Sequence, residues 1–154
     1  MASPRCHQPP VTALPTAVRV PAAAAELFDH LLAPVDPGTG PRSAGLLIEP
    51  WSGHPVTAMH RAGVVGGADL VELCAVCADA GEHPVDHPGG PELLLVLATW
   101  RPGAGVAPTD AHRACWGAML TTTAGSAVHL VDWLLIDGDG IASVATVLGR
   151  RPRW

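Results

Sequence analysis

The chain contains no lysine: all nine basic residues are arginine, and the formal net charge is -5. Phosphate-cradling glycine loops of the P-loop type depend on a lysine, so this class of nucleotide site is excluded. Four of the nine arginines lie at the extreme ends of the chain, namely Arg5, Arg150, Arg151 and Arg153. Because a broad basic face is lacking, we expect no nucleic-acid partner.

Long apolar segments are lacking as well. The N-terminus shows no apolar core of signal-peptide length after Arg5. No apolar run approaches the roughly 18 residues of a membrane span. We therefore expect a cytoplasmic protein with no membrane partner, whose cysteines are reduced thiols. The sequence leaves open whether the chain forms a homodimer.

Common catalytic contexts are also missing. No serine stands in a Gly-x-Ser-x-Gly motif, so a serine nucleophile on a strained turn is not supported. His54 and His60 have no acidic residue between Pro50 and Ala68 that would orient their rings, as a catalytic histidine usually requires. We interpret both histidines as surface or structural residues.

What is present indicates one folded domain. Apolar residues make up 48% and charged residues 15% of 154 residues, which is typical of a globular protein able to bury roughly two-thirds of its surface. Residues 1–21, with five prolines, predict a flexible leader. Residues 22–148 predict the domain, and residues 149–154 form a basic tail.

Hydrophobic periodicity and turn residues predict the order helix, strand, strand, helix, strand, helix, strand, strand. The expected helices are 22–32, 69–80 and 109–123, and the expected strands are 44–49, 55–65, 93–98, 127–136 and 141–148. Residues 50–54 and 137–140 read as hairpin turns. Thr109 or Asp110 is the expected cap of the helix that ends near Thr123, and Gly125 reads as its stop. This order indicates an α/β fold with a mixed sheet flanked by helices.

Cys74-x-x-Cys77, followed by His83 and His87, is the strongest metal pattern in the chain. Two thiolates and two imidazoles can form a tetrahedral zinc site. Both cysteines share a helix face with Leu70, however, where cysteine behaves as a small apolar residue. We favour core packing, with a zinc or redox pair as the alternative.

Asp132, Asp137 and Asp139 form a second candidate, a carboxylate cluster for a hard cation. Asp137 and Asp139 alternate with glycine, which is what a tight hairpin turn requires. We therefore interpret these two residues as turn formers.

The stretch from Leu93 to Trp116 carries a resemblance to a known family. LLLVLA is followed by Thr99-Trp100-Arg101-Pro102, by GAGVA and by PTDAH, and later by LVDWLLI and GDG. In spacing this resembles the RadC-type JAB (JAMM) domain, in which a strand leads to H-x-H-P, a small-residue loop, P-S-x-x-D, L-x-D-H-I-I-I and G-D-G. Upstream, LLIEPWSGHPV is similar to the first hairpin of the family, and GADLVELCAVCADA to its first long helix. The resemblance covers about residues 22–148 and implies a JAB/JAMM metalloprotease-like, cytidine-deaminase-like architecture.

The departures from the family pattern fall at its metal site. The two histidine ligands correspond to Thr99 and Arg101, the serine to Thr109 and the aspartate ligand to His112. The catalytic glutamate has no counterpart in PVTAMHRAG. Because arginine places a permanent cation where zinc would sit, the resemblance implies a disabled metal site and no cofactor.

Two functions follow as expectations. The first is a non-catalytic binding or scaffolding module for a protein or peptide partner, a pseudoenzyme. The binding cleft expected for it comprises Thr99, Trp100, Arg101, Thr109 and His112. There Trp100 and Arg101 would anchor a peptide carboxylate or an acidic partner. The alternative is a metal-dependent hydrolase or isopeptidase-like enzyme with a rebuilt zinc site, its ligands drawn from His83, His87, His112 and Cys115. Longer RadC-like chains carry a DNA-binding-like region, but a proline-rich leader stands in its place here, so a role in DNA repair is not expected.

Overall fold

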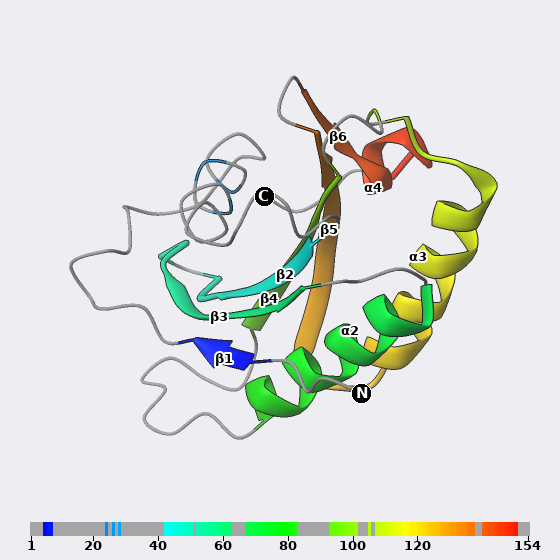
Figure 1. Cartoon of the computed structure of the whole chain (residues 1–154). Coiled ribbons are helices and arrows are strands. Elements are labelled where there is room, and N and C mark those ends of the chain that lie inside the picture. The colour runs from blue at the N-terminus through cyan, green and yellow to red at the C-terminus, as the bar shows by residue number, and fades with distance from the viewer. Residues whose placement is uncertain are drawn as a thin grey trace.

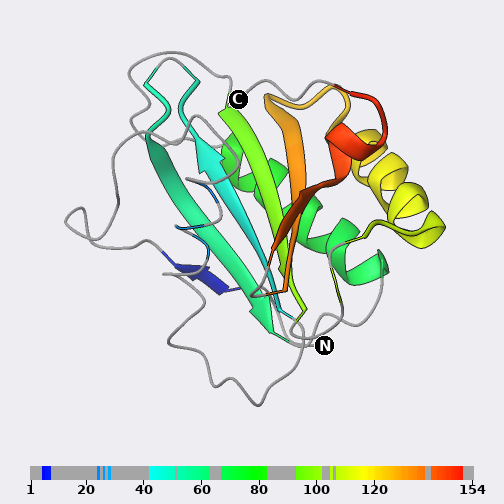
Figure 2. The same ribbon diagram turned by 90° about the horizontal axis from the view of Figure 1, so that it is seen from above.

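The computed structural model describes a six-stranded mixed sheet with helices α2 and α3 on one face (Figures 1 and 2). The strand order is β1-β3-β2-β4-β5-β6. The strands are β1 (Arg5–His7), β2 (Arg42–Ile48), β3 (Pro55–Ala62), β4 (Leu93–Trp100), β5 (Val128–Ile136) and β6 (Ile141–Ser143), and the helices are α2 (Gly67–Glu82), α3 (Asp110–Thr123) and α4 (Val144–Val147). The described residues are 5–7, 24, 26, 28, 42–50, 52–62, 67–82, 93–101, 105, 107–137 and 140–150. The predicted α/β class is confirmed.

The first predicted hairpin is confirmed, because β2 and β3 pair antiparallel. Gly53 turns the chain with φ of 72°, a conformation that costs glycine little, and its N–H donates to the Glu49 carbonyl at 2.8 Å. β2 also pairs antiparallel with β4, and this pairing sets Arg42 opposite Trp100. The first residue of β2 and the last residue of β4 therefore lie side by side at the same end of the strands.

Strands β4 and β5 are parallel and are connected through α3, as a parallel pair requires. α3 begins after the N-cap Thr109, in agreement with the prediction, and Gly125 follows its end with φ of 77°. The carboxyl end of β4 consequently lies next to the first turn of α3, and this places the candidate site.

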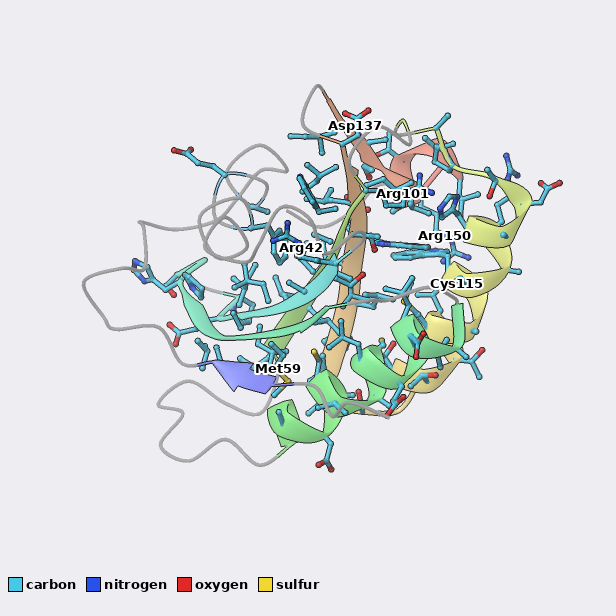
Figure 3. The ribbon with its side chains drawn as sticks, in the orientation of Figure 1. Arg42, Met59, Arg101, Cys115, Asp137 and Arg150 are labelled. Atoms are coloured by element: carbon cyan, nitrogen blue, oxygen red, sulfur yellow. The ribbon has the colours of Figure 1, made fainter. Side chains whose placement is uncertain are left out.

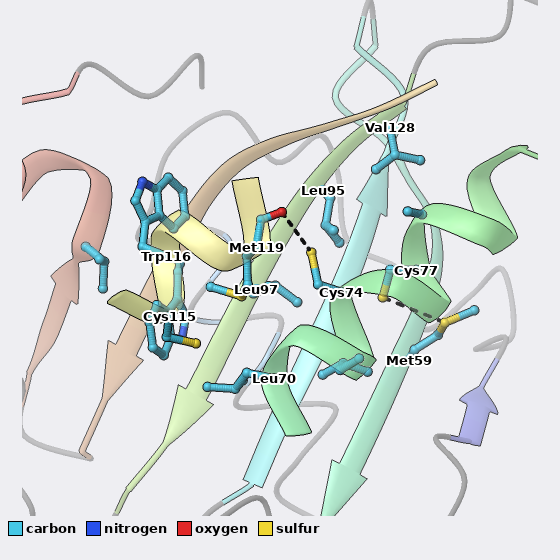
Figure 4. Packing of buried hydrophobic residues seen from close by; sticks show 14 of the residues in the cluster. Met59, Leu70, Cys74, Cys77, Leu95, Leu97, Cys115, Trp116, Met119 and Val128 are labelled. Atoms are coloured by element: carbon cyan, nitrogen blue, oxygen red, sulfur yellow. Dashed lines mark hydrogen bonds between the residues drawn. The ribbon is translucent and has the colours of Figure 1, made fainter. Parts of the chain in front are cut away.

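Side chains of β4 alternate between the two faces of the sheet. Leu95 and Leu97 belong to the core beneath the helices, which includes Cys74, Cys77 and Met119 (Figure 4). Val96 and Ala98 belong to the core on the opposite face, which includes Phe28, and Trp100 packs against that second core. Because side chains alternate along a strand, the neighbours Thr99 and Trp100 at the end of β4 lie on opposite faces of the sheet.

α2 approaches β2 closely at Gly45. A Cβ atom added there would lie 2.5 Å from Cys77 Sγ and 3.2 Å from Leu97 Cδ2. The helix can sit this close to the sheet because glycine has no side chain.

The prediction of one strand over residues 141–148 is wrong beyond Ser143. β6 ends at Ser143, and the chain continues as the one-turn helix α4. Ser143 caps this turn, since its Oγ accepts the N–H of Thr146 at 3.1 Å. The Ala145 N–H is bound by the buried carboxylate of Asp132, so a tertiary acceptor overrides the strand preference of the β-branched residues.

One strand lies within the predicted leader. Arg5–His7 forms β1, the edge strand paired antiparallel with β3. In the predicted helix 22–32, the described residues Ala24, Glu26 and Phe28 are helical, and Ala24 and Phe28 are fully buried. In the described part of the tail, the Arg150 N–H donates to the Ala145 carbonyl at 2.9 Å.

Within the described ranges, no helix combines the length and the apolar character needed to cross a bilayer.

Candidate functional site

The end of β4 and the start of α3 bring together three of the five predicted cleft residues: Arg101, Thr109 and His112. Arg101 follows β4 directly, and its N–H donates to the Ile136 carbonyl of β5 at 2.8 Å. Thr109 and His112 are joined through the first turn of α3. Figure 3 shows Arg101 at this end of the sheet.

His112 is held by the cap of α3. Its Nδ1 accepts the backbone N–H of Thr109 at 2.8 Å and lies 3.0 Å from Thr109 Oγ1. This resembles a capping box in which histidine takes the place of glutamate. Since a backbone N–H can only donate, Nδ1 must be unprotonated, and the neutral ring carries its proton on Nε2.

The environment of His112 keeps its ring neutral. Burial lowers the pKa of His112, and the positive charge of Arg101 lowers it further. The ring also packs edge to face on Trp133, with centroids 5.3 Å apart and planes at 63°. His112 is therefore a fixed neutral ring with an N–H donor at Nε2, for which no hydrogen bond is found among the described residues.

Arg101 is only partly satisfied. Its Nη2 donates to the Gly105 carbonyl at 3.2 Å, while its Nε is buried without an acceptor among the described residues. A buried donor without a partner costs about 1–3 kcal/mol. The side chain as a whole is partly exposed, so solvent or a ligand reaches the rest of the guanidinium.

Thr99 lies in the interior and does not line the cleft. It is 4% exposed, and its hydroxyl accepts the indole N–H of Trp133 at 2.9 Å. The same oxygen lies 3.0 Å from Ser43 Oγ of β2. Neither partner of Thr99 could be predicted from the local sequence, because only the pairing of β2, β4 and β5 brings these residues together.

Trp100 faces the other side of the sheet, away from α3. Its ring lies under a guanidinium, 4.4 Å from the ring centroid to Cζ, but this guanidinium belongs to Arg42. Arg42 is buried and starts the neighbouring strand β2 (Figure 3). The predicted aromatic–arginine pair therefore exists with a different arginine and on the opposite face from Thr99.

The three candidate aspartates do not form one cluster among the residues that the structure describes. Asp132 is fully buried and accepts the N–H groups of Trp133 at 2.8 Å and Ala145 at 3.2 Å, and the Ser143 hydroxyl at 2.6 Å. Asp137 accepts the Gly140 N–H at 3.0 Å, which is the predicted turn role. Asp139 lies outside the described residues.

The cysteine pair points in two directions. Cys74 Sγ donates to the Met119 carbonyl of α3 at 3.9 Å, whereas Cys77 Sγ contacts Met59 Sδ of β3 at 3.8 Å (Figure 4). Both side chains are fully buried, and burial together with the nearby Cys115 raises the pKa of Cys74 to about 12. A thiolate would be needed to bind zinc, so this geometry favours core packing.

The remaining metal candidates are dispersed or lie outside the described residues. Cys115 Sγ lies 3.7 Å from the Gly67 carbonyl, and burial raises the pKa of its thiol. His83 and His87 lie outside the described residues, as does the side chain of His60, and His54 is exposed. In the described ranges, no three His, Cys, Asp or Glu side chains gather as a metal-ligand set.

The groups at the end of β4 do not fit a zinc ion. The Thr99 hydroxyl is engaged by two partners, and Arg101 is a permanent cation. If His112 gave its Nε2 lone pair to a metal, its proton would have to sit on Nδ1, facing the Thr109 N–H. What this arrangement offers chemically is hydrogen-bond donors and positive charge.

Comparison of the chain with models of protein families, with curated proteins and with solved structures finds no match.

Proposed function

We propose that this chain is a non-catalytic, cytoplasmic JAB-like domain that binds a protein or peptide partner through the cleft formed by Arg101, Thr109 and His112. Three features support the JAB-like assignment: the order of strands and helices, the Thr109 cap after the β4 loop, and the Gly-Asp-Gly turn that follows β5. The finer family assignment rests on the resemblance of the motifs.

The observation that carries the proposal is the hydrogen bond from the Thr109 N–H to His112 Nδ1. Of the four residues that correspond to the metal motif of the JAB family, His112 alone is of a type common among zinc ligands. The bond fixes this ring as a donor at Nε2, and Arg101 adds positive charge beside it. A site of donors and one cation is suited to an anionic group of a partner and unsuited to a metal.

The metal content of the purified protein tests this proposal. We expect the protein, purified without added metal and then dialysed against zinc, to retain no stoichiometric zinc in mass spectrometry of the intact chain. About one zinc per chain that is lost in His112→Ala would overturn the binding-module proposal and favour the hydrolase with a rebuilt site.

Cys77→Ser is the matched control. Zinc that survives His112→Ala but is lost in Cys77→Ser would identify a structural metal at the cysteine pair. That result would leave the cleft without metal, as proposed. Free thiols at Cys74, Cys77 and Cys115 agree with a reducing compartment.

A further inference from the structure

Two N–H donors at the end of β4 and the start of α3 lack acceptors among the described residues. One is Nε–H of Arg101, which is buried, and the other is Nε2–H of His112. Both belong to side chains held in place from elsewhere, Arg101 through Gly105 and His112 through Thr109 and Trp133. Donors fixed in advance bind an acceptor with little loss of side-chain entropy.

The two donor side chains together carry a single positive charge. Arg101 is always protonated, and His112 is neutral for the reasons given above. The other charged side chains of the first turn of α3 are Asp110 and Arg113, which are exposed and approach each other to 3.9 Å. Their charges offset one another, so this turn adds no net charge to that of Arg101, and the N-terminus of α3 adds the positive end of its dipole.

From these donors and this charge we infer that the cleft binds one carboxylate group, with its two oxygens accepting hydrogen bonds from Arg101 and His112. A carboxylate offers two acceptor oxygens and one negative charge, which matches two donors and one cation. A phosphate carries up to two negative charges, which a single arginine matches less well than it matches the one charge of a carboxylate. This inference rests on the proposed function, because a zinc ion bound to His112 would occupy Nε2 and leave no N–H donor there.

Nuclear magnetic resonance of the whole chain tests the inference with defined small carboxylates. N-acetylglycine represents a chain terminus, and the α-amide of N-acetylglutamic acid represents an acidic side chain. We expect saturable shifts of the Arg101 Nε–H and His112 ring signals with at least one of them. N-acetylglycinamide, which has no carboxylate, should leave both signals in place.

Three variants locate the binding. Arg101→Gln removes the charge and should weaken carboxylate binding about tenfold or more. Arg101→Lys keeps the charge without the Nε donor, and we expect a loss of several-fold, because lysine does not form the same paired hydrogen bonds. Arg113→Gln is the matched control, since it removes an exposed arginine from the same helix turn, and it should bind within about twofold of the parent.

Each outcome decides the inference. Shifts confined to Arg101 and His112 support it, and the stronger of the two carboxylates identifies the source, a chain terminus or an acidic side chain. Absence of shifts, equal binding by Arg101→Gln, or tighter binding of inorganic phosphate would refute it. Each variant is first checked for a cooperative unfolding transition, and the Arg113→Gln comparison holds the helix turn constant.

Zinc chloride, titrated separately, distinguishes failure of the inference from failure of the proposed function. Zinc that moves the His112 ring signals and is removed by a chelator refutes both. If neither zinc nor any of the carboxylates shifts the Arg101 and His112 signals, the carboxylate inference alone is refuted. In that case the binding-module proposal would need another recognised group.

Discussion

Two polar groups, Asp132 in the middle of β5 and Arg101 directly after β4, differ in how completely their hydrogen-bonding capacity is satisfied. Asp132 is fully buried, and its carboxylate accepts three hydrogen bonds from Trp133, Ser143 and Ala145. Arg101 keeps a buried Nε without an acceptor among the described residues, next to a histidine fixed as a donor. A saturated buried group stabilises a fold, whereas fixed donors that await an acceptor are suited to binding.

The same contrast explains why the two groups differ in exposure. The Asp132 carboxylate joins β5, the end of β6 and the start of α4. It therefore stabilises the point at Ser143 where the chain turns from strand to helix. Arg101 and His112 sit at the open end of the β4–α3 connection and are partly exposed. The first group is structural, and the second is the proposed cleft.

Asp132→Ala should give the largest loss of stability of the changes considered. It leaves two backbone N–H groups and the Ser143 hydroxyl without their acceptor in the interior, and we expect the free energy of unfolding to fall by about 3 kcal/mol or more. Urea unfolding measures this. Asp132→Asn retains one acceptor oxygen and should lose roughly half as much.

Arg101→Met is the counterpart that could break the comparison. Because it removes a donor that is already unsatisfied, it should lower the unfolding free energy by less than about 1 kcal/mol, or raise it. If Arg101→Met cost as much as Asp132→Ala, the Arg101 group would be structural, and the contrast between the two groups would be wrong.

Gly45→Ala should destabilise the chain by an intermediate amount without touching either polar group. The new Cβ would overlap Cys77 Sγ, and overpacking of this kind costs about 1–3 kcal/mol. Cys77→Ala removes that sulfur, so the double variant should be more stable than the sum of the two single effects by about 1 kcal/mol. Strict additivity in urea unfolding would show that the helix does not pack on β2 at this point.

Gly117→Ala is the control for the glycine change. A Cβ at Gly117 meets nothing within 4 Å on the exposed side of α3. Alanine there should stabilise the helix by roughly 0.5–1 kcal/mol. A loss of unfolding free energy at Gly45 and a gain at Gly117 would distinguish the effect of close packing from that of backbone entropy.

Much of the fold follows from local patterns, because hairpins, caps and apolar periods act over a few residues. The β2–β3 hairpin, the Thr109 cap and the Gly125 stop are of this kind. The prediction for residues 141–148 failed because the Asp132 carboxylate, distant in sequence, holds the Ala145 N–H in a helical turn. Local strand propensity carried no information about that acceptor.

The candidate site was predictable only in part, for a related reason. The predicted strand ends at Ala98, which puts Thr99 and Trp100 together in one loop. In the structure β4 continues to Trp100, and its two-residue period places the two side chains on opposite faces of the sheet. Strand alternation could have signalled this separation. The Ser43 and Trp133 partners of Thr99 depend on the pairing of three strands, which the sequence does not specify locally.

The smallest expected effect is a pH dependence that separates the two polar groups by their chemistry. The pKa of His112 is lowered in the folded chain, while in the unfolded chain it returns to about 6.5. Below that pH the unfolded chain binds a proton that the folded chain does not, so stability falls as the pH drops toward the lower folded pKa. Urea unfolding at neutral pH and below about pH 6 measures the slope.

His112→Phe keeps a ring against Trp133 and removes the titration, so this variant should lose part of the slope even though it is less stable at every pH. His54→Gln, which changes an exposed histidine of the β2–β3 turn, is the comparison variant. An unchanged slope in His112→Phe would mean that the ring is not held neutral by its surroundings. Since the donor at Nε2 depends on that neutral, Thr109-bound ring, such a result would weaken the distinction between a saturated structural group at Asp132 and a donor site at Arg101.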